Sequence, residues 1–118
     1  MVVPLPTLRR GEVWLTDLGQ PVGHEQGYRR PAVIVSASRL NTTSGGLVIV
    51  VPLTRTRRPS PLHVEVEPGP SGLSETSYAK VQDVRSISTD RLIKRYGVLP
   101  LVTLSEINRI LTLLLDLH

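Results

Sequence analysis

The chain has 118 residues, 40% of them hydrophobic, which suits one globular domain (residues 1–118) with its own core. No apolar run is long enough to cross a membrane, so a membrane protein is not expected. The sequence contains no cysteine, which excludes disulfides and cysteine-based zinc sites and is compatible with a reducing cytoplasm. The N-terminus lacks the pattern of a signal peptide, and we therefore expect a cytoplasmic protein.

The charge balance is moderately basic and strongly biased towards arginine. Fourteen basic residues face ten acidic ones, for a net charge of +4, and only Lys80 and Lys94 are lysines. Arginine offers a planar fork that binds phosphate or carboxylate through two hydrogen bonds, so a polyanionic partner is expected. Aromatic residues make up only 3% of the chain, which argues against extensive base stacking of the kind seen in single-strand binding proteins.

The N-terminal half is predicted to alternate between strands and loops. Residues 1–8 form a proline-rich, flexible tail, and the alternating residues 12–18 form a strand. After a polar loop, residues 31–37 form a buried strand, and residues 38–46 are a turn-rich connection with room for one helical turn. Leu47–Thr54 is rich in β-branched residues and is the strongest predicted strand.

One proline interrupts that strongest strand. Pro52 cannot donate a hydrogen bond to a neighbouring strand, so an edge or a bulge is expected at this position. Thr54 follows directly after it, where a strand end can direct a hydroxyl group towards a site.

In the second half, we predict a basic loop at residues 55–61, a strand at 62–67, a second loop at 68–76 and another strand at 77–84. A short helix at residues 89–95 and an extended piece at 97–101 follow. Strand alternation places His63 on an outward face, where we assign it no role. The same alternation places Lys80 and Gln82 on one side of their strand and Asp83 on the other.

The chain closes with a long helix. Thr103 and Glu106 fit a capping box that would start it. An apolar stripe follows at helical spacing and is widened by further leucines: Leu104, Ile107, Ile110, Leu111, Leu113, Leu114, Leu115 and Leu117. Such a wide stripe predicts a second contact surface, either a dimer interface or a deep groove. Short strands followed by one helix favour a small, strongly curved antiparallel sheet or a partly open barrel.

The loop at residues 23–31 has the most informative side chains. Gly23 and Gly27 bracket it, and Pro31 restricts Arg30 to an extended conformation. Within the loop the chain places an imidazole, a carboxylate, a phenol and two guanidinium groups: His24, Glu25, Tyr28, Arg29 and Arg30. These groups can bind a phosphodiester and transfer a proton. The alternative is a polar hairpin loop with solvated charges.

Several segments, in order, resemble the MazF/PemK family of toxins from bacterial toxin–antitoxin pairs. They are RGEVW at residues 10–14, GHEQ at 23–26, RPAV at 30–33, VVPLT at 50–54 and DVRSIS at 83–88. The similarity extends from about residue 9 to the C-terminus. It implies a mainly β fold, an SH3-like barrel with a C-terminal helix, that works as a homodimer.

The resemblance also implies an activity. Members of this family are sequence-selective endoribonucleases that cleave single-stranded messenger RNA without a metal or cofactor and are inhibited by a small antitoxin, here expected to have an acidic, disordered tail. Attack of a ribose 2′-OH on phosphorus would leave a 2′,3′-cyclic phosphate and a 5′-OH end. Two alternatives stay open: a non-catalytic toxin of the same fold that binds DNA gyrase, and a housekeeping RNA-binding barrel.

The resemblance assigns four residues to catalysis. Arg30 would hold the scissile phosphate, and the Thr54 hydroxyl would contact it. Glu25 matches a position thought to accept a proton, although a salt bridge to Arg30 is an alternative role. His24 matches a histidine that supports the reaction in Kid-type members. In those members an arginine and an aspartate transfer protons, but here Lys80 and Gln82 occupy their places, so we prefer the MazF-type assignment to Glu25, Arg30 and Thr54.

Further residues are candidates for RNA contact, with solubility as the alternative role of any one cation: Gln26, Arg29, Arg55, Arg57, Arg58, Lys80 and Gln82. Asp83 lies one place after Gln82, which would turn it to the opposite face of the strand. No metal site is expected at His24 and Glu25, because Tyr28 stands where a zinc-binding pattern needs a second histidine.

Overall fold

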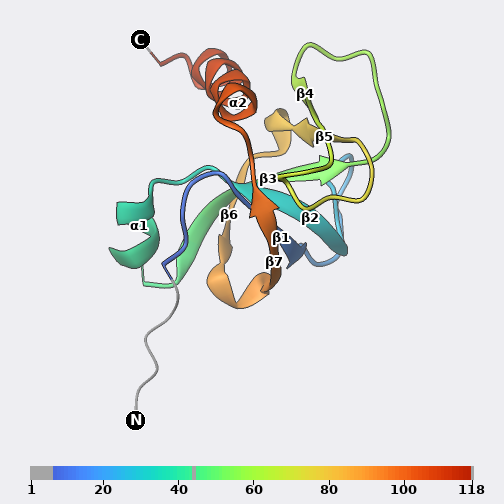
Figure 1. The fold of residues 1–118 in the computed structure, drawn as a ribbon. Helices are drawn as coiled ribbons and strands as arrows, with labels where there is room; N and C mark the ends of the chain where they lie inside the picture. Colours follow the sequence, from blue (N-terminus) through green and yellow to red (C-terminus); the bar gives the residue numbers. More distant parts are fainter. Residues whose placement is uncertain (1–6, 44, 118) are drawn as a thin grey trace.

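The computed structural model describes residues 7–43 and 45–117. Within them the chain forms seven strands: β1 (Glu12–Asp17), β2 (Arg29–Ile34), β3 (Leu47–Thr54), β4 (His63–Val66), β5 (Ser77–Lys80), β6 (Arg85–Ser88) and β7 (Leu92–Val98). It also forms two α-helices and two 3₁₀ turns: α1 (Ser38–Thr43), α2 (Leu101–Leu114), η1 (Val81–Asp83) and η2 (Thr89–Arg91). The expected mainly β fold with a C-terminal helix is confirmed (Figure 1).

All the strand pairs are antiparallel, and β3 is the central strand. The sheet order is β4-β5-β3-β2-β1-β7, with β6 also paired to β3. One edge of β3 pairs with β2, whereas the other edge pairs first with β6 through Leu47–Val50 and then with β5 through Leu53 and Thr54. Pro52 lies between these two partners, so the local edge that the proline predicts is present.

Two apolar clusters cover the two faces of the sheet. Val33 and Val51 face one cluster, which continues beneath α2, while the neighbouring Ala32 and Val50 face the other. Adjacent residues of β2 and β3 are therefore buried on opposite faces. This explains why both segments are continuously apolar, because a strand covered on both faces has no polar side.

Helix α2 packs against β4 and η1 at one end of the sheet (Figure 1). Its own residues Ile107 and Ile110 are buried in the first cluster. The expected capping box is wrong: Pro100 occupies the N-cap position, no side chain caps the helix, and Thr103 lies within the first turn. Proline tolerates this position because it has no N–H to satisfy. Further apolar residues of the helix and of the segment that follows it are exposed: Leu101, Val102, Leu113, Leu114, Leu115 and Leu117.

Two predicted boundaries are wrong around the late segments. The strand expected at residues 77–84 ends at Lys80, where η1 turns the chain into β6, a strand that was not predicted. The helix expected at residues 89–95 is only the single turn η2, whose start at Ser88 is as expected, since the Ser88 hydroxyl accepts a hydrogen bond from Asp90 N at 3.2 Å. The chain then continues as β7 because pairing with β1 outweighs the local helical preference.

Strand β2 also differs from its prediction, starting at Arg29 and ending at Ile34 rather than covering residues 31–37. Residues 1–6 of the expected tail lie outside the described residues. Leu8 packs against the second cluster, and its carbonyl accepts a hydrogen bond from Asn41 Nδ2 at 2.8 Å. No helix in the described ranges is long and apolar enough to cross a membrane.

Candidate functional site

The loop between β1 and β2 is compact because both of its ends are tied together. Leu18 N donates to Tyr28 O at 2.8 Å, and Tyr28 N donates to Gly19 O at 2.6 Å. Within the loop, Gly27 lies so close to the Pro21 ring that any side chain at Gly27 would overlap it. This close approach requires glycine and gives the polar segment a defined shape.

Charged side chains from η1 and β6 bind the main chain of the same loop. Asp83 Oδ2 accepts a hydrogen bond from Gln26 N at 2.8 Å, and Arg85 Nη2 donates to Gln26 O at 2.6 Å. Arg85 and Asp83 also form an ion pair at 2.8 Å. The main chain of Gln26 is thus held by Asp83 as acceptor and by Arg85 as donor. The neighbouring carbonyl of His24 accepts a hydrogen bond from Lys80 Nζ.

These contacts correct one expectation about Asp83. Strand alternation placed Asp83 on the face away from Lys80 and Gln82, but η1 interrupts the strand after Lys80 and the alternation ends there. Asp83 therefore reaches the loop. Sequence reasoning missed Asp83 and Arg85 as site residues, although both belong to the DVRSIS segment that supports the family resemblance.

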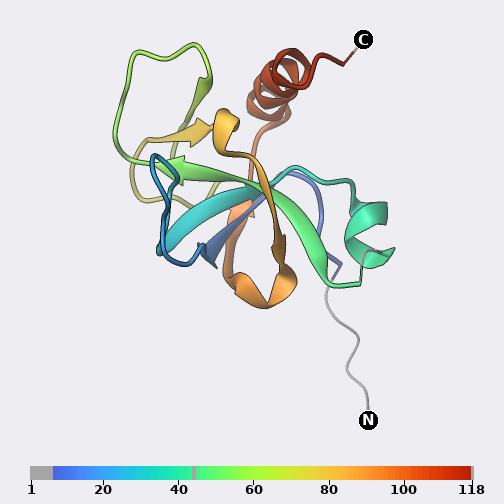
Figure 2. The ribbon, with the colours of Figure 1, turned by 180° about the vertical axis from the view of Figure 1, so that it is seen from behind.

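The loop forms one wall of a cavity of about 610 Å³. Seven of the predicted site residues line it together: His24, Glu25, Gln26, Arg30, Arg58, Lys80 and Gln82. They come from the β1–β2 loop, the start of β2, the β3–β4 loop, the end of β5 and η1. The two loops leave the sheet on the same side of the molecule, as both views show (Figures 1 and 2).

Arg30 is well placed to bind an anion in this cavity. Its Nε donates to Gly27 O at 3.2 Å, which orients the guanidinium group. Among the residues that the structure describes, no hydrogen bond or ion pair engages its two terminal nitrogens. A guanidinium group with its fork unoccupied can bind a phosphate through both of these nitrogens.

Glu25 and His24 are both exposed at the cavity. Glu25 Oε1 accepts a hydrogen bond from Val22 N at 3.0 Å, which fixes the carboxylate within the loop. Within the described part of the chain no ion pair joins Glu25 to Arg30, so the structure does not contain the alternative salt bridge.

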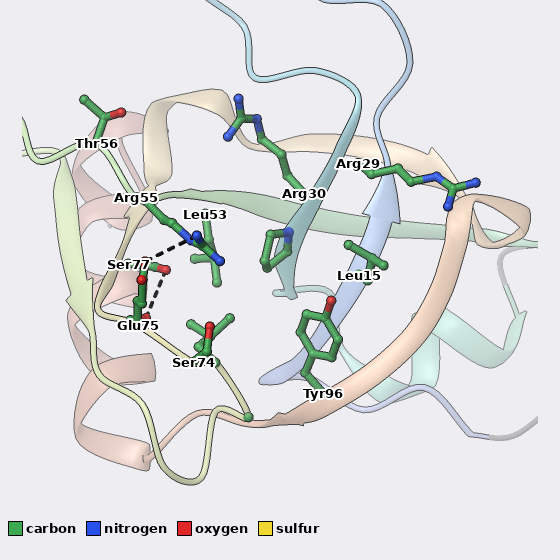
Figure 3. Close-up of a pocket in the computed structure, with 13 residues that line it drawn as sticks. Leu15, Arg29, Arg30, Leu53, Arg55, Thr56, Ser74, Glu75, Ser77 and Tyr96 are labelled. Carbon is green, nitrogen blue, oxygen red and sulfur yellow. Dashed lines mark hydrogen bonds and ion pairs between the residues drawn. The ribbon is translucent and has the colours of Figure 1, made fainter.

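A second cavity of about 560 Å³ lies on the other side of Arg30, which lines both cavities. Its walls include Arg29, Arg55 and Tyr96 (Figure 3). The side chains of Arg29 and Arg30 extend in different directions, as an extended segment predicts. Arg55 pairs with Glu75 at 3.3 Å, but both side chains are mostly exposed, and such surface pairs are worth about 0.2–1 kcal/mol.

Thr54 and Arg57 lie outside both of these cavities. Thr54 is 6% exposed, and its hydroxyl accepts a hydrogen bond from Thr56 N at 3.2 Å, which shapes the start of the β3–β4 loop. Arg57 is exposed and lines a neighbouring depression together with Arg58 and His63. The basic loop therefore contributes Arg58 to the first cavity and Arg55 to the second.

His63 is a cavity residue that the sequence did not identify. Its Nε2 lies 3.2 Å from Gln82 Nε2, and its Nδ1 is buried without a partner among the described residues. Burial lowers the pKa of His63 below 6.5, and the charges of Lys80 and Arg58 lower it further. The lowered pKa favours the neutral imidazole at pH 7, and the tautomer with its proton on Nδ1 would let Nε2 accept from Gln82. Only the pairing of His63 with Lys80 across β4 and β5 reveals its place at the site.

The ionisable residues that the structure describes do not form a metal-binding cluster. In residues 7–43 and 45–117, no three histidine, cysteine, aspartate or glutamate side chains lie together as potential ligands. The candidate site is instead a mainly cationic cavity with one carboxylate and two imidazoles at its edge. Such a site suits phosphate binding and proton transfer.

Comparison with known proteins identifies two relatives of this chain. The chain is 36% identical over 115 residues to the endoribonuclease MazF9 of Mycobacterium tuberculosis, covering 93% of this chain and 98% of that protein. It is 30% identical to the endoribonuclease MazF of Staphylococcus saprophyticus, covering 94% and 93% of the two chains.

Solved structures show the same fold over nearly the whole chain. MazF from Deinococcus radiodurans superposes with a TM-score of 0.79 at 26% identity, covering 95% of this chain and 99% of that one. An endoribonuclease from a mycobacterial species, in complex with its cognate antitoxin, superposes with a TM-score of 0.75 at 30% identity, covering 94% and 97%. The model of the PemK-like, MazF-like toxins matches residues 9–115, and the chain belongs to this family of type II toxin–antitoxin systems.

Proposed function

We propose that the chain is a sequence-selective, metal-independent endoribonuclease that cleaves single-stranded messenger RNA and acts as the toxin of a toxin–antitoxin pair. The observation that carries the proposal is the cavity where Arg30, Lys80 and Arg58 meet Glu25 and His24. The names of the relatives, endoribonucleases MazF9 and MazF, support the same activity.

The reaction that suits this cavity is an internal transfer at phosphorus. The ribose 2′-oxygen forms a bond to the neighbouring phosphorus while the bond from phosphorus to the 5′-oxygen breaks. A base accepts the 2′-OH proton and an acid donates a proton to the departing 5′-oxygen, leaving a 2′,3′-cyclic phosphate and a 5′-OH end. The charge on the non-bridging oxygens grows in the transition state, and fixed cations stabilise it.

Each group of the cavity has a role in this proposal. Arg30 binds the non-bridging oxygens through its unoccupied fork, and Lys80 adds charge beside it. Glu25 and His24 are the groups that exchange protons with the 2′- and 5′-oxygens. Thr54 lies outside this cavity and its hydroxyl accepts from Thr56 N, so its expected contact with the phosphate would require the start of the β3–β4 loop to move.

The surrounding basic residues provide a path for the RNA backbone. Gln26 and Gln82 offer amide groups inside the cavity, while Arg29, Arg55, Arg57 and Arg58 extend positive charge from it along the surface. Mostly exposed cations of this kind attract a polyanion without reading its sequence. Sequence selection would then depend on the shapes of the flanking loops.

The assembly is part of the same proposal. The exposed apolar residues of α2 would pair with a second copy of the chain, because such a surface is unfavourable in water. An antitoxin with an acidic, disordered tail would cover the basic cavity and exclude RNA. A solved relative in complex with its cognate antitoxin supports this partner. The toxin would act in the cytoplasm, where messenger RNA is found.

The decisive experiment is cleavage of a defined RNA by pure protein in excess EDTA, followed by mapping of the new ends. We expect persistent cleavage that gives 5′-OH and 2′,3′-cyclic phosphate ends. A 2′-deoxy nucleotide at the cleaved position should abolish the reaction because it removes the nucleophile. Loss of activity in EDTA that magnesium or zinc restores would contradict the mechanism. Inhibition of DNA gyrase by a preparation that cannot cleave RNA would favour the non-catalytic alternative.

A further inference from the structure

Tyr28 has an unusual backbone conformation for its residue type. Its φ angle is +59°, and Asp116 is the one other non-glycine residue with positive φ in the described ranges. A side chain in this region costs of order 1–3 kcal/mol and persists only where the surroundings impose it. Here the hydrogen bonds to Leu18 and Gly19 impose it on both sides of the residue.

Packing of the Tyr28 side chain does not offset this conformational cost. The residue is 64% exposed and belongs to neither apolar cluster. Glycine would adopt the same backbone conformation without strain. The residue therefore exposes a large, flat aromatic surface to solvent, and this surface does not contribute to the packing of the fold.

The position of the ring indicates what it could contact. Tyr28 lines the same cavity as Arg30, two residues further along the chain, and the other side chains of that cavity are mostly polar or charged. An aromatic face beside a guanidinium group fits a nucleotide, whose phosphate binds the cation while its base stacks on the ring. An apolar peptide side chain would instead favour a pocket with apolar walls.

We propose that Tyr28 is a stacking platform for the base adjacent to the phosphodiester that Arg30 binds. This inference rests on the proposed ribonuclease function and adds an affinity-determining residue to it. The hydrogen-bonded backbone fixes where the side chain of Tyr28 leaves the main chain beside the cavity, so this segment does not have to be ordered when a base binds. Because every base has an aromatic face, the contact contributes affinity with little dependence on sequence.

The test compares Tyr28→Gly with Tyr28→Phe and Tyr28→Ala. Cleavage of a short RNA gives kcat and KM, and a copy with a 2′-deoxy nucleotide at the cleaved position gives Kd without turnover. Tyr28→Gly should raise KM and Kd about 5- to 150-fold, the range that loss of one stacked base implies, with kcat changed less than threefold. Tyr28→Phe should restore both values because it retains the ring.

The backbone controls separate stacking from folding. Tyr28→Gly should unfold at the same or higher urea concentration than the wild type, whereas Tyr28→Ala keeps the strain and should not gain stability. Both should lose RNA affinity equally. A spectroscopic control is Tyr28→Trp, whose added fluorescence over the Trp14 background should be quenched by the 2′-deoxy RNA.

Three outcomes overturn the inference. If the wild type cleaves RNA and Tyr28→Gly retains KM and Kd, the ring does not stack on the substrate, although the proposed function stands. If the wild type does not cleave RNA, the proposed function fails. If Tyr28→Gly then also binds the 2′-deoxy RNA with the same Kd as the wild type, stacking is rejected as well. If Tyr28→Gly weakens binding of an acidic antitoxin peptide but not of RNA, the ring belongs to a protein interface.

Discussion

The β1–β2 loop and helix α2 both flank the sheet, but they are held to it by opposite means. The loop is fixed through its main chain by Asp83, Arg85 and Lys80, and its outward face is polar. The helix is fixed by the buried side chains of Ile107 and Ile110, and much of its outward face is apolar. We infer that the loop is built to bind a charged ligand, whereas the helix is built to bind another protein surface.

This comparison predicts that the two regions separate activity from stability. Truncation of the buried side chains of the helix should destabilise the fold. Substitutions in the loop should instead remove activity while the core remains intact.

Ile107→Ala should lower the free energy of unfolding by about 2–5 kcal/mol, because Ile107 is fully buried and its truncation leaves a cavity. Urea unfolding monitored by circular dichroism would measure the loss. Leu113→Ala is the matched control on the same helix, since Leu113 is 66% exposed and its truncation should cost the isolated chain little. Equal destabilisation by both variants would contradict the division between a buried and an exposed face.

Arg30→Ala should raise the barrier to cleavage by about 2.7–4 kcal/mol, the usual loss for one donor that stabilises the transition state. Single-turnover cleavage of a defined RNA measures it, and the urea midpoint should stay close to that of the wild type. Arg30→Lys should recover only part of the rate, because an ammonium group cannot reproduce the fork. Near-normal turnover by folded Arg30→Ala would remove Arg30 from the site.

Asp83→Ala should loosen the β1–β2 loop, since it removes the acceptor for Gln26 N and the partner of Arg85. We expect a loss of about 1.5–3 kcal/mol in local stability, typical of hydrogen bonds to charged groups. Hydrogen exchange at the Gln26 amide would detect it, together with a fall in kcat. Asp83→Asn should be intermediate because its amide oxygen can still accept from Gln26. A fully protected Gln26 amide in Asp83→Ala would show that the loop is held by other contacts.

Leu113→Glu should weaken self-association without unfolding the chain, because it places a charge on the exposed apolar face of α2. Sedimentation equilibrium would show a shift from dimer to monomer. Ser105→Glu adds the same charge at an exposed polar position of the helix and should leave association unchanged. A Leu113→Glu protein that remains dimeric would place the interface elsewhere on the molecule.

The smallest effect concerns the pH dependence that His63 contributes. Because its folded-state pKa lies below 6.5, the unfolded chain takes up a proton first as the pH falls. The contribution of His63 to stability is therefore complete above pH 6.5 and is lost as the pH falls from 6.5 through the folded-state pKa. Unfolding of the wild type and of His63→Asn at pH 7.5 and pH 5.5 would measure it. We expect the variant to lose less stability between the two values, and an equal loss would contradict the assignment.

Much of the strand pattern and the location of the candidate loop could be predicted from local sequence. β3 was predicted at its observed bounds, and β1 and β4 within two residues, because their apolar periodicity agrees with their burial. The prediction was wrong where long-range pairing outweighs local preference. β7 has a helix-like segment that becomes a strand against β1, and α2 begins at Leu101, after Pro100, instead of at the capping box.

Composition and spacing along the chain were enough to predict the mainly β fold, the basic charge, the loop with His24, Glu25 and Arg30, and the family resemblance. The residues that complete the site depend instead on how the chain packs. Asp83 reaches Gln26 because η1 ends the alternation of β5, and His63 enters the cavity because β4 pairs with β5. Tyr28 takes its strained conformation from hydrogen bonds to Leu18 and Gly19. Each of these placements depends on contacts between residues that local periodicity does not relate, and so they arise only when the chain folds.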